Sequence, residues 1–393
     1  MMVDRSWRFG DKEIEYIRQA IESGLHNQWN RILEERFAER FGVNYAIGVN
    51  SGTSALHCAL YALGVRAGDE VIVPPLTFGA PAFAALYLGA VPVFADIRPD
   101  TFTIDPEDIK RKISGRTKAI IAVSLYGLPS DIIPIMKIAK DHNIRVVEDN
   151  AECFLGTCHG RLAGSVADMA IFSFQRSKHL TSESGGIVVT NENLLAERAR
   201  KFSILGYATL GAKSGQAVVT MEQVQRPDFV RHELIAPNYR LPEICAAMMV
   251  AQLEKADMLV KQRQTIAEYY AAAVQGCSWF IPQAVPDGFV NSYWTYAARL
   301  DTEAKGVSWY DFRRVYQEKG GEPYYAAWLV NYLEPAFRGL VFGEDHTHYG
   351  EGLCPIAERV QPQLIQLKTN FESLDYARRQ AGLLRETIDY FGR

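Results

Sequence analysis

Residues 145–149 read RVVED and residues 169–174 read MAIFSF, two short runs rich in Val, Ile and other apolar residues. Apolar residues on both faces of such a run are typical of a strand buried on both sides of a sheet. Similar runs lie at 46–50, 70–74, 91–96, 119–125 and 187–190. Because helical patterns separate several of these runs, the sequence predicts an α/β fold with a mostly parallel, seven-stranded sheet flanked by helices.

Helical patterns follow recognisable start signals. Residues 54–63 come after a Ser-Gly-Thr-Ser turn, and residues 133–141 come after Ser130 and Asp131, either of which suits a helix cap. Residues 242–270 form one long helix-like stretch with Ala, Leu and Gln. These segments are expected to cover the sheet and to lead out of it.

A change of composition divides the chain. Beyond about residue 277, tryptophan and tyrosine become frequent among short elements. We predict a large α/β domain at 1–255 and a smaller C-terminal α+β domain at 256–393, since 393 residues exceed one typical domain. The first ~20 residues are expected to pack on the smaller domain.

The overall composition excludes several classes of partner. The net charge is −4, so no strong field favours nucleic acid or an anionic membrane. The six cysteines lack paired short spacing, which indicates neither a metal site nor a disulfide framework. No signal-peptide core begins the chain, and no apolar run reaches the ~20 residues that span a bilayer. We expect a cytoplasmic protein.

Two reactive side chains follow strands of the predicted sheet. Asp149 ends one strand, and ligands of open α/β sheets lie beyond the carboxyl ends of strands, where a carboxylate can hold a cation. Lys178 lies shortly after another strand, and a desolvated lysine amine can attack a carbonyl. The simpler interpretations are a helix cap and a surface lysine. His179 is a ligand, a base or, more simply, a packed histidine.

Two glycine-containing turns lie near these residues in the pattern. In 50–54, NSGTS, Gly52 allows close approach of the backbone, and the N–H groups and hydroxyls at the helix start suit a phosphate. Gly185 and Gly186 allow a second tight turn. A phosphate cradle, a strand-end acid and a nucleophilic lysine are together the parts of a pyridoxal-phosphate (PLP) site.

The chain resembles the DegT/DnrJ/EryC1/StrS family of sugar aminotransferases, within the aspartate-aminotransferase-like PLP enzymes of fold type I. The resemblance covers nearly the whole chain. It rests on the motifs SGTSAL at 51–56, GDEVI at 68–72, TF at 77–78, GAVPVF at 89–94, RTKAI at 116–120, ED at 148–149, SF at 173–174 with Lys178, and NYR at 238–240.

The resemblance implies a role for each matching residue. Lys178 is the Schiff-base lysine, and Asp149 pairs with the pyridine nitrogen and keeps it protonated. The other implied cofactor contacts are Phe78 on the ring, Gly52, Thr53 and Ser173 at the phosphate, Glu152, and Asn238 from the neighbouring subunit. The resemblance therefore implies a homodimer with shared active sites.

Three positions depart from the family pattern. Glu152 stands where Gln or His is common, although some members that aminate GDP-linked sugars also carry Glu there. The turn at 183–186 reads ESGG in place of GEGG, and Ala236-Pro237 replaces the glycine context before Asn238. The departures at 183–186 and 236–237 change the loop geometry that we expect, but PLP is still the expected cofactor.

The implied activity is a transamination in two halves. An amino-acid donor, by family habit glutamate, leaves its amine on the cofactor as pyridoxamine phosphate, and a keto-sugar takes it, with Lys178 moving the proton. The favoured acceptor is a nucleotide-linked 4-keto-6-deoxyhexose, in polysaccharide or antibiotic sugar biosynthesis. The aromatic residues Trp294, Tyr324, Tyr325 and Trp328 line the sugar site or, more simply, fill a core.

Three alternatives stay open from the sequence. A cyclitol aminotransferase would act on a keto-inositol by the same chemistry. A PLP-dependent sugar dehydratase would carry His in place of the lysine, which requires His179 to take the place of Lys178. A non-catalytic homologue would bind the cofactor without turnover, and the presence of both Lys178 and Asp149 argues against it.

Overall fold

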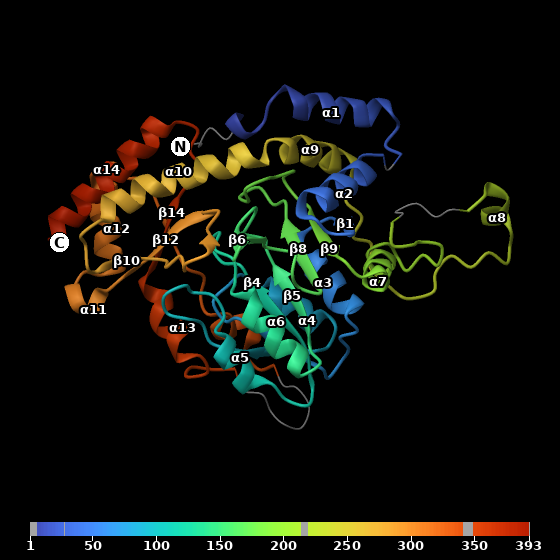
Figure 1. Ribbon diagram of the computed structural model, residues 1–393, viewed down its shortest axis with the longest axis horizontal. Coiled ribbons are helices and arrows are strands. Elements are labelled where there is room, and N and C mark those ends of the chain that lie inside the picture. Colours follow the sequence, from blue (N-terminus) through green and yellow to red (C-terminus); the bar gives the residue numbers. More distant parts are fainter. Residues whose placement is uncertain (1–5, 27, 214–218, 341–348, 393) are drawn as a thin grey trace.

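The computed structural model describes residues 6–26, 28–213, 219–340 and 349–392 (Figure 1). Its central feature is a seven-stranded sheet in the order β1-β9-β8-β5-β4-β2-β3. The strands are β1 (Tyr45–Val49), β2 (Glu70–Val73), β3 (Val91–Phe94), β4 (Thr117–Val123), β5 (Arg145–Asp149), β8 (Met169–Ser173) and β9 (Gly186–Thr190). All seven predicted strands are therefore present, each within a few residues of its predicted ends.

The sheet is mostly parallel, as predicted. The pairs β2·β3, β2·β4, β4·β5 and β5·β8 are parallel, whereas β9 pairs antiparallel with both β1 and β8. Residues of one strand alternate between two cores: Met169 and Ile171 of β8 belong to one apolar cluster, and Ala170 and Phe172 to another. Burial on both faces explains why the strands are mostly apolar, with charged residues near their ends.

Helices cover both faces of this sheet (Figure 1). They are α2 (Gln28–Phe41), α3 (Gly52–Ala62), α4 (Ala80–Tyr87), α5 (Pro106–Lys112), α6 (Ile132–Asp141), α7 (Asn193–Ser203) and α9 (Glu243–Glu254). Asp131 occupies the N-cap position of α6, as predicted, but its side chain makes no capping hydrogen bond. A small three-stranded sheet joins β6 (Thr157–Cys158), β7 (Arg161–Leu162) and β11 (Phe289–Val290).

The C-terminal part combines helices with a second sheet. Its four strands, in the order β10-β12-β14-β13, are antiparallel: β10 (Phe280–Pro282), β12 (Thr295–Leu300), β14 (Leu364–Lys368) and β13 (Tyr325–Ala326). Its helices are α10 (Ala256–Val274), α11 (Thr302–Lys305), α12 (Trp309–Glu318), α13 (Pro355–Val360) and α14 (Leu374–Phe391), with short 3-10 turns at Asn331–Leu333, Pro335–Phe337 and Gln361–Gln363.

The single helical stretch predicted at 242–270 is wrong in one respect, because it forms two helices. Helix α9 ends at Glu254 and α10 begins at Ala256, with Lys255 between them at φ −112° and ψ 16°. Helix α9 packs on α1 (Asp11–Glu22) and α2, whereas α10 packs on α14. Because of this break, the two helices pack into different apolar cores, α9 with α1 and α2 and α10 with α14.

The N-terminal segment begins with a 3-10 turn, η1 (Ser6–Arg8), and continues into α1 along α9 (Figure 1). Glu13 accepts a hydrogen bond from Gln252 Nε2 at 2.7 Å and pairs with Lys255 at 2.6 Å. Among the described residues, α1 therefore contacts the helix that precedes the predicted boundary at 255. The division into domains itself stays a prediction.

Between α7 and α9 the chain leaves the body and carries α8 (Met221–Gln225) outward (Figure 1). We call residues 219–237 the α8 arm. Its apolar side chains Met221 and Ile235 are 70% and 101% exposed. No helix among the described residues is long and apolar enough to cross a membrane.

Candidate active site

Lys178 lies in the irregular loop between β8 and β9, beyond the carboxyl end of β8. A turn sets its backbone, since the Lys178 N–H donates to the Gln175 carbonyl at 2.9 Å. The amine Nζ lies 3.2 Å from Glu152 Oε1 and 4.4 Å from the centre of the Trp294 ring. A carboxylate and an aromatic face thus hold the amine in a largely buried position.

Asp149 is the last residue of β5 and lies in the same cavity as Lys178. Its Oδ1 accepts a hydrogen bond from the Ala151 N–H at 3.0 Å. Burial raises the pKa of Asp149 to about 6, and the charge of Lys178 opposes this shift. A buried carboxylate at the end of a strand favours a cationic partner.

Glu148 differs from its neighbour Asp149 because successive side chains of a strand point to opposite faces. It accepts a hydrogen bond from the Gly164 N–H on the other side of the sheet and does not line the cavity. Burial raises the pKa of Glu148 to about 7. The sequence pair Glu148-Asp149 therefore contributes one carboxylate to the site.

The start of α3 forms a narrow cradle beside Lys178. The first N–H groups of a helix have no partner within the helix, and Ser51 satisfies one of them by accepting from the Ser54 N–H at 3.0 Å. The N–H groups of Gly52 and Thr53 precede it at the helix start. A Cβ on Gly52 would lie 2.9 Å from the Cβ of Ser173, and one on Gly186 would lie 2.6 Å from the Ser51 carbonyl oxygen. Only glycine allows this approach, and the cradle suits a phosphate.

One cavity of about 290 Å³ brings these groups together. Every predicted site residue except Asn238 lines it: Gly52, Thr53, Phe78, Asp149, Glu152, Ser173 and Lys178. Asn238 is exposed at the base of the α8 arm, where its side-chain oxygen accepts from Arg240 Nη1 at 3.0 Å. The predicted residues thus form one site, with Asn238 outside the cavity of its own chain.

These residues fit pyridoxal phosphate. The glycine-lined start of α3 matches its phosphate, the buried Asp149 matches its ring nitrogen, and the Lys178 amine matches its carbonyl carbon. Phe78 is 59% exposed and packs edge-on against Trp328, with the ring centres 6.0 Å apart, so its ring is available at the cavity mouth.

His179 turns away from the cavity. It is 1% exposed, and its Nε2 lies 3.0 Å from the Ser292 carbonyl oxygen. Burial holds the pKa of His179 well below its usual range, and the nearby Arg263 adds to this effect. The structure therefore supports the simplest interpretation of this residue, a packed neutral histidine.

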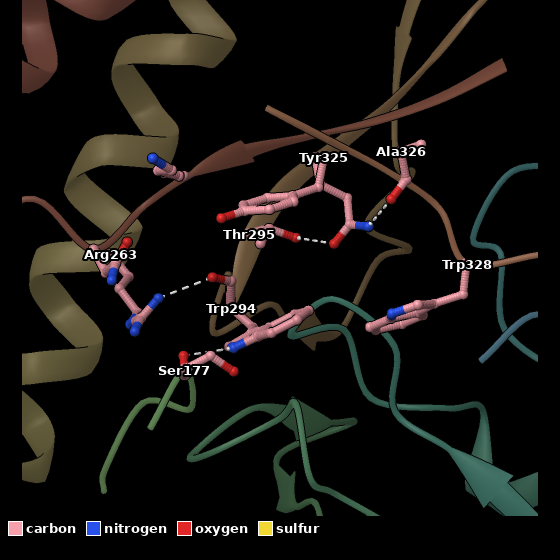
Figure 2. A pocket seen from close by; sticks show the side chains of 10 residues that line it. Ser177, Arg263, Trp294, Thr295, Tyr325, Ala326 and Trp328 are labelled. Carbon is pink, nitrogen blue, oxygen red and sulfur yellow. Dashed lines mark hydrogen bonds between the residues drawn. The ribbon is translucent and has the colours of Figure 1, made fainter. Parts of the chain in front are cut away.

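A second chamber of about 370 Å³ adjoins the first and shares Ser177, Trp294 and Trp328 with it (Figure 2). We call it the outer chamber. Its other lining residues are Arg263, Thr295, Tyr325, Ala326, Gln366, Lys368 and Asn370. The sequence indicated its aromatic walls but not its polar residues, which come from α10, β12, β14 and the segment after it. Tyr324 is only 3% exposed and belongs to the C-terminal core.

Comparisons with known proteins identify similar aminotransferases. The family model of the DegT/DnrJ/EryC1/StrS aminotransferases matches residues 8–372. The GDP-perosamine synthase of Escherichia coli O157:H7 is 40% identical over 262 residues, 66% of this chain and 67% of that protein. The GDP-perosamine synthase of Vibrio cholerae is 35% identical over 294 residues, 74% and 75% of the two chains. The structure of S. venezuelae DesV in complex with a ketimine intermediate matches with a TM-score of 0.83 at 28% identity, over 97% of this chain and 94% of that one.

Proposed function

Because this chain belongs to the DegT/DnrJ/EryC1/StrS aminotransferase family, we propose that it moves an amine from glutamate to a GDP-linked 4-keto-6-deoxyhexose. It is a PLP-dependent nucleotide-sugar aminotransferase of fold type I. Two relatives are named GDP-perosamine synthase, which supports GDP as the carrier of the sugar. The corresponding acceptor is the 4-keto sugar carried on GDP.

Each residue of the inner cavity has a proposed task. The bound cofactor supplies the electron sink that lets a Cα–H bond break. Lys178 holds the cofactor covalently and, when free, takes and returns a proton at Nζ. Asp149 holds a proton on the ring nitrogen through its negative charge, and Glu152 orients the Lys178 amine at 3.2 Å.

The remaining cofactor contacts act by position. The N–H groups and hydroxyls of Gly52, Thr53 and Ser173 bind the phosphate at the start of α3. Phe78, which lines the same cavity, would cover one face of the ring. Together these contacts fix the cofactor carbonyl beside Lys178.

The outer chamber is the proposed place of the hexose and of part of its nucleotide. Trp294 and Trp328 lie with parallel rings, 6.1 Å between centres, and Tyr325 lies on the other side of the chamber (Figure 2). Aromatic faces suit the apolar C–H face of a sugar, while Lys368 and Asn370 offer polar contacts to its hydroxyls and phosphates. The wall shared with the inner cavity leads the sugar to Lys178.

One observation carries the proposal against the dehydratase alternative: Lys178 points into the cavity, whereas His179 is buried behind it. A histidine acting in place of the lysine would need the opposite arrangement. The lysine amine that transamination requires is thus the group in position.

The proposed assembly is a homodimer with shared active sites. Asn238 lies outside the cavity of its own chain, and the adjacent α8 arm exposes apolar side chains, which supports a role at a second subunit. In this proposal, Asn238 contacts the cofactor phosphate of the partner.

The acceptor can be tested directly. The purified chain in its pyridoxamine form is mixed with GDP-, dTDP- and UDP-linked 4-keto-6-deoxyhexoses and with a keto-inositol, and mass spectrometry follows the gain of the amine. The proposal expects single-turnover amination of the GDP-linked sugar at least about tenfold faster than that of the others. Equal rates for the dTDP-linked sugar would overturn the nucleotide assignment, and amination of the keto-inositol alone would favour the cyclitol alternative.

A further inference from the structure

Three consecutive carbonyl groups in the lysine loop accept hydrogen bonds from distant side chains. The Arg176 and Lys178 carbonyls accept from Arg8, through Nη2 at 2.7 Å and Nη1 at 2.8 Å. The Ser177 carbonyl between them accepts from Trp294 Nε1 at 2.8 Å (Figure 2). The backbone on both sides of the lysine is therefore held from outside the loop.

Arg8 is well placed to fix this loop. Its guanidinium is a rigid planar fork, and one fork here serves two carbonyls two residues apart. The residue is 1% exposed, so water does not compete for these bonds. Its own carbonyl accepts from Gln252 Nε2 at 2.6 Å, which ties Arg8 to α9.

Gln252 connects the same helix to the far side of the loop. Its Oε1 accepts from the Thr181 N–H at 3.3 Å, while its Nε2 serves Arg8 and Glu13. The segment from Arg176 to Thr181 is therefore hydrogen-bonded to Arg8 of η1 at its start and to Gln252 of α9 at its end.

Such fastening matters because the lysine loop has no regular secondary structure. Lys178 carries its amine on a flexible four-carbon stem, so the position of Nζ depends on where its Cα is held. Displacing a reacting group by about 1 Å can cost about a hundredfold in rate. The turn bond from the Lys178 N–H to the Gln175 carbonyl does not involve the carbonyls of residues 176–178. Those carbonyls are held by the side chains of Arg8 and Trp294.

A second buried arginine, from the C-terminal part of the chain, also contacts the Lys178 carbonyl. Arg263 of α10 is 2% exposed and donates to the Trp294 carbonyl at 2.8 Å, with a longer contact of 3.5 Å to the Lys178 carbonyl. Trp294 and Arg263 thus brace each other and the loop (Figure 2). The loop meets the N-terminal segment on one side and the C-terminal part on the other.

We propose that Arg8 is a positioning residue for Lys178, which fixes the backbone of the lysine loop so that the amine points into the cofactor cavity. The inference rests on the proposed role of Lys178 in holding the cofactor. It assigns to the N-terminal segment a part in assembling the active site, beyond the packing of α1 on α9.

The test compares Arg8→Ala and Arg8→Lys with a matched control, Arg18→Ala. Arg18 is also in the N-terminal segment, but its side chain is 67% exposed and pairs only loosely with Glu22 at 4.0 Å. The first measurement uses cofactor-free protein and follows amide hydrogen exchange in peptides covering 174–182. Arg8→Ala should exchange about tenfold faster there, since charge-assisted bonds to two carbonyls are lost, and Arg18→Ala should match the wild type.

The second measurement follows return of the cofactor. Apo-protein is mixed with pyridoxal phosphate, quenched with borohydride at set times, and digested to find the label on Lys178. Labelling should be about tenfold slower or more in Arg8→Ala and unchanged in Arg18→Ala. It should be intermediate in Arg8→Lys, which offers one donor nitrogen in place of the two that reach the carbonyls. Lys178→Ala should give no label at this site. Label on another lysine would contradict the proposed function, whereas wild-type labelling of Lys178 in Arg8→Ala would contradict only the positioning role.

A purely structural role predicts a different pattern. It would raise exchange throughout α1 and α9 and lower the unfolding temperature, with an unchanged labelling rate at Lys178, and that result would overturn the inference. If Arg8→Ala fails to fold, Arg8→Lys and Trp294→Phe decide the matter. Each removes part of the carbonyl bonding, and wild-type labelling rates in both would also overturn it.

Discussion

The Lys178 amine donates a hydrogen bond to Glu152 Oε1 at 3.2 Å in a cavity that also contains Asp149. Burial raises the pKa of Glu152, and the charge of Lys178 acts against this rise. The charge of Glu152 in turn contributes to the raised pKa of Asp149. One amine thus compensates two buried carboxylates, so the cavity lacks one positive charge, which a protonated ring nitrogen would supply.

The first prediction concerns the covalent bond to the cofactor. Purified protein should show a visible absorption band that borohydride removes, and peptide mapping should place the reduced cofactor on Lys178. Lys178→Ala should lack the band, because no other lysine lines the cavity as described. Lys178→Arg and Lys178→Gln should also lack the band, so a reduced cofactor on another lysine in these variants would show that another amine binds it.

The second prediction concerns the stability of the cofactor-free protein. The pKa of Asp149 rises from 3.8 to about 6 on folding, so the folded state binds the proton more tightly than the unfolded state between these values. Stability is therefore lost as the pH rises through this window, by up to about 3 kcal/mol. Asp149→Asn should be more stable than the wild type above pH ~6, with the difference vanishing toward pH ~4. Urea unfolding of both apo-proteins across this range measures it, and a pH-independent difference would contradict the shift.

The same residue should behave oppositely in catalysis. Asp149→Asn and Asp149→Ala remove the charge that keeps the ring nitrogen protonated, so turnover should fall by about a hundredfold or more. Glu148→Gln is the matched control, because that carboxyl is equally buried but faces away from the cavity. Its turnover should stay within about threefold of the wild type. Near-normal turnover in Asp149→Ala would mean that another acid serves the ring.

The sheet and the inner cavity could be predicted because their causes are local. Strands buried on both faces show apolar residues on both faces of their middle positions, and the Gly52 turn and Asp149 lie directly at strand or helix ends. The break at Lys255 could not be predicted, because the residues around it are good helix formers and the break is imposed by packing on two different cores.

The polar residues of the outer chamber and the lysine loop contacts could not be predicted for a related reason. Arg8 and Arg263 lie 170 and 85 positions away from Lys178 in the sequence, and neither belongs to a local motif. Each arginine alone looks like an ordinary surface cation, since such residues are rarely buried. Only the folded chain shows that both reach one carbonyl group.

The third prediction concerns the outer chamber. Tyr325→Ala removes a wall of the proposed sugar site that does not line the inner cavity, so the KM for the GDP-linked keto-sugar should rise about tenfold or more. The glutamate half-reaction, measured alone by the loss of the visible band, should change less than about threefold. Tyr310→Ala is the control, because Tyr310 is 79% exposed and lies outside both chambers. Equal effects on both half-reactions would place Tyr325 at the cofactor instead.

The last prediction concerns assembly. If Asn238 serves the partner's site, its loss should cost about 0.5–3 kcal/mol of cofactor phosphate binding without unfolding the protein, because the side chain is exposed. Co-assembled Lys178→Ala and Asn238→Ala chains then form heterodimers in which one site carries both lesions and the other carries neither.

The heterodimer site that carries neither lesion should be fully active. The mixture should recover turnover that the Lys178→Ala homodimer lacks, with the wild-type cofactor affinity that the Asn238→Ala homodimer lacks. If Asn238 acted within its own chain, every heterodimer site would carry one lesion, and titration of cofactor into the mixture would reveal no site of wild-type affinity and turnover. A fully active monomer in sedimentation at assay concentration would equally rule out a shared site.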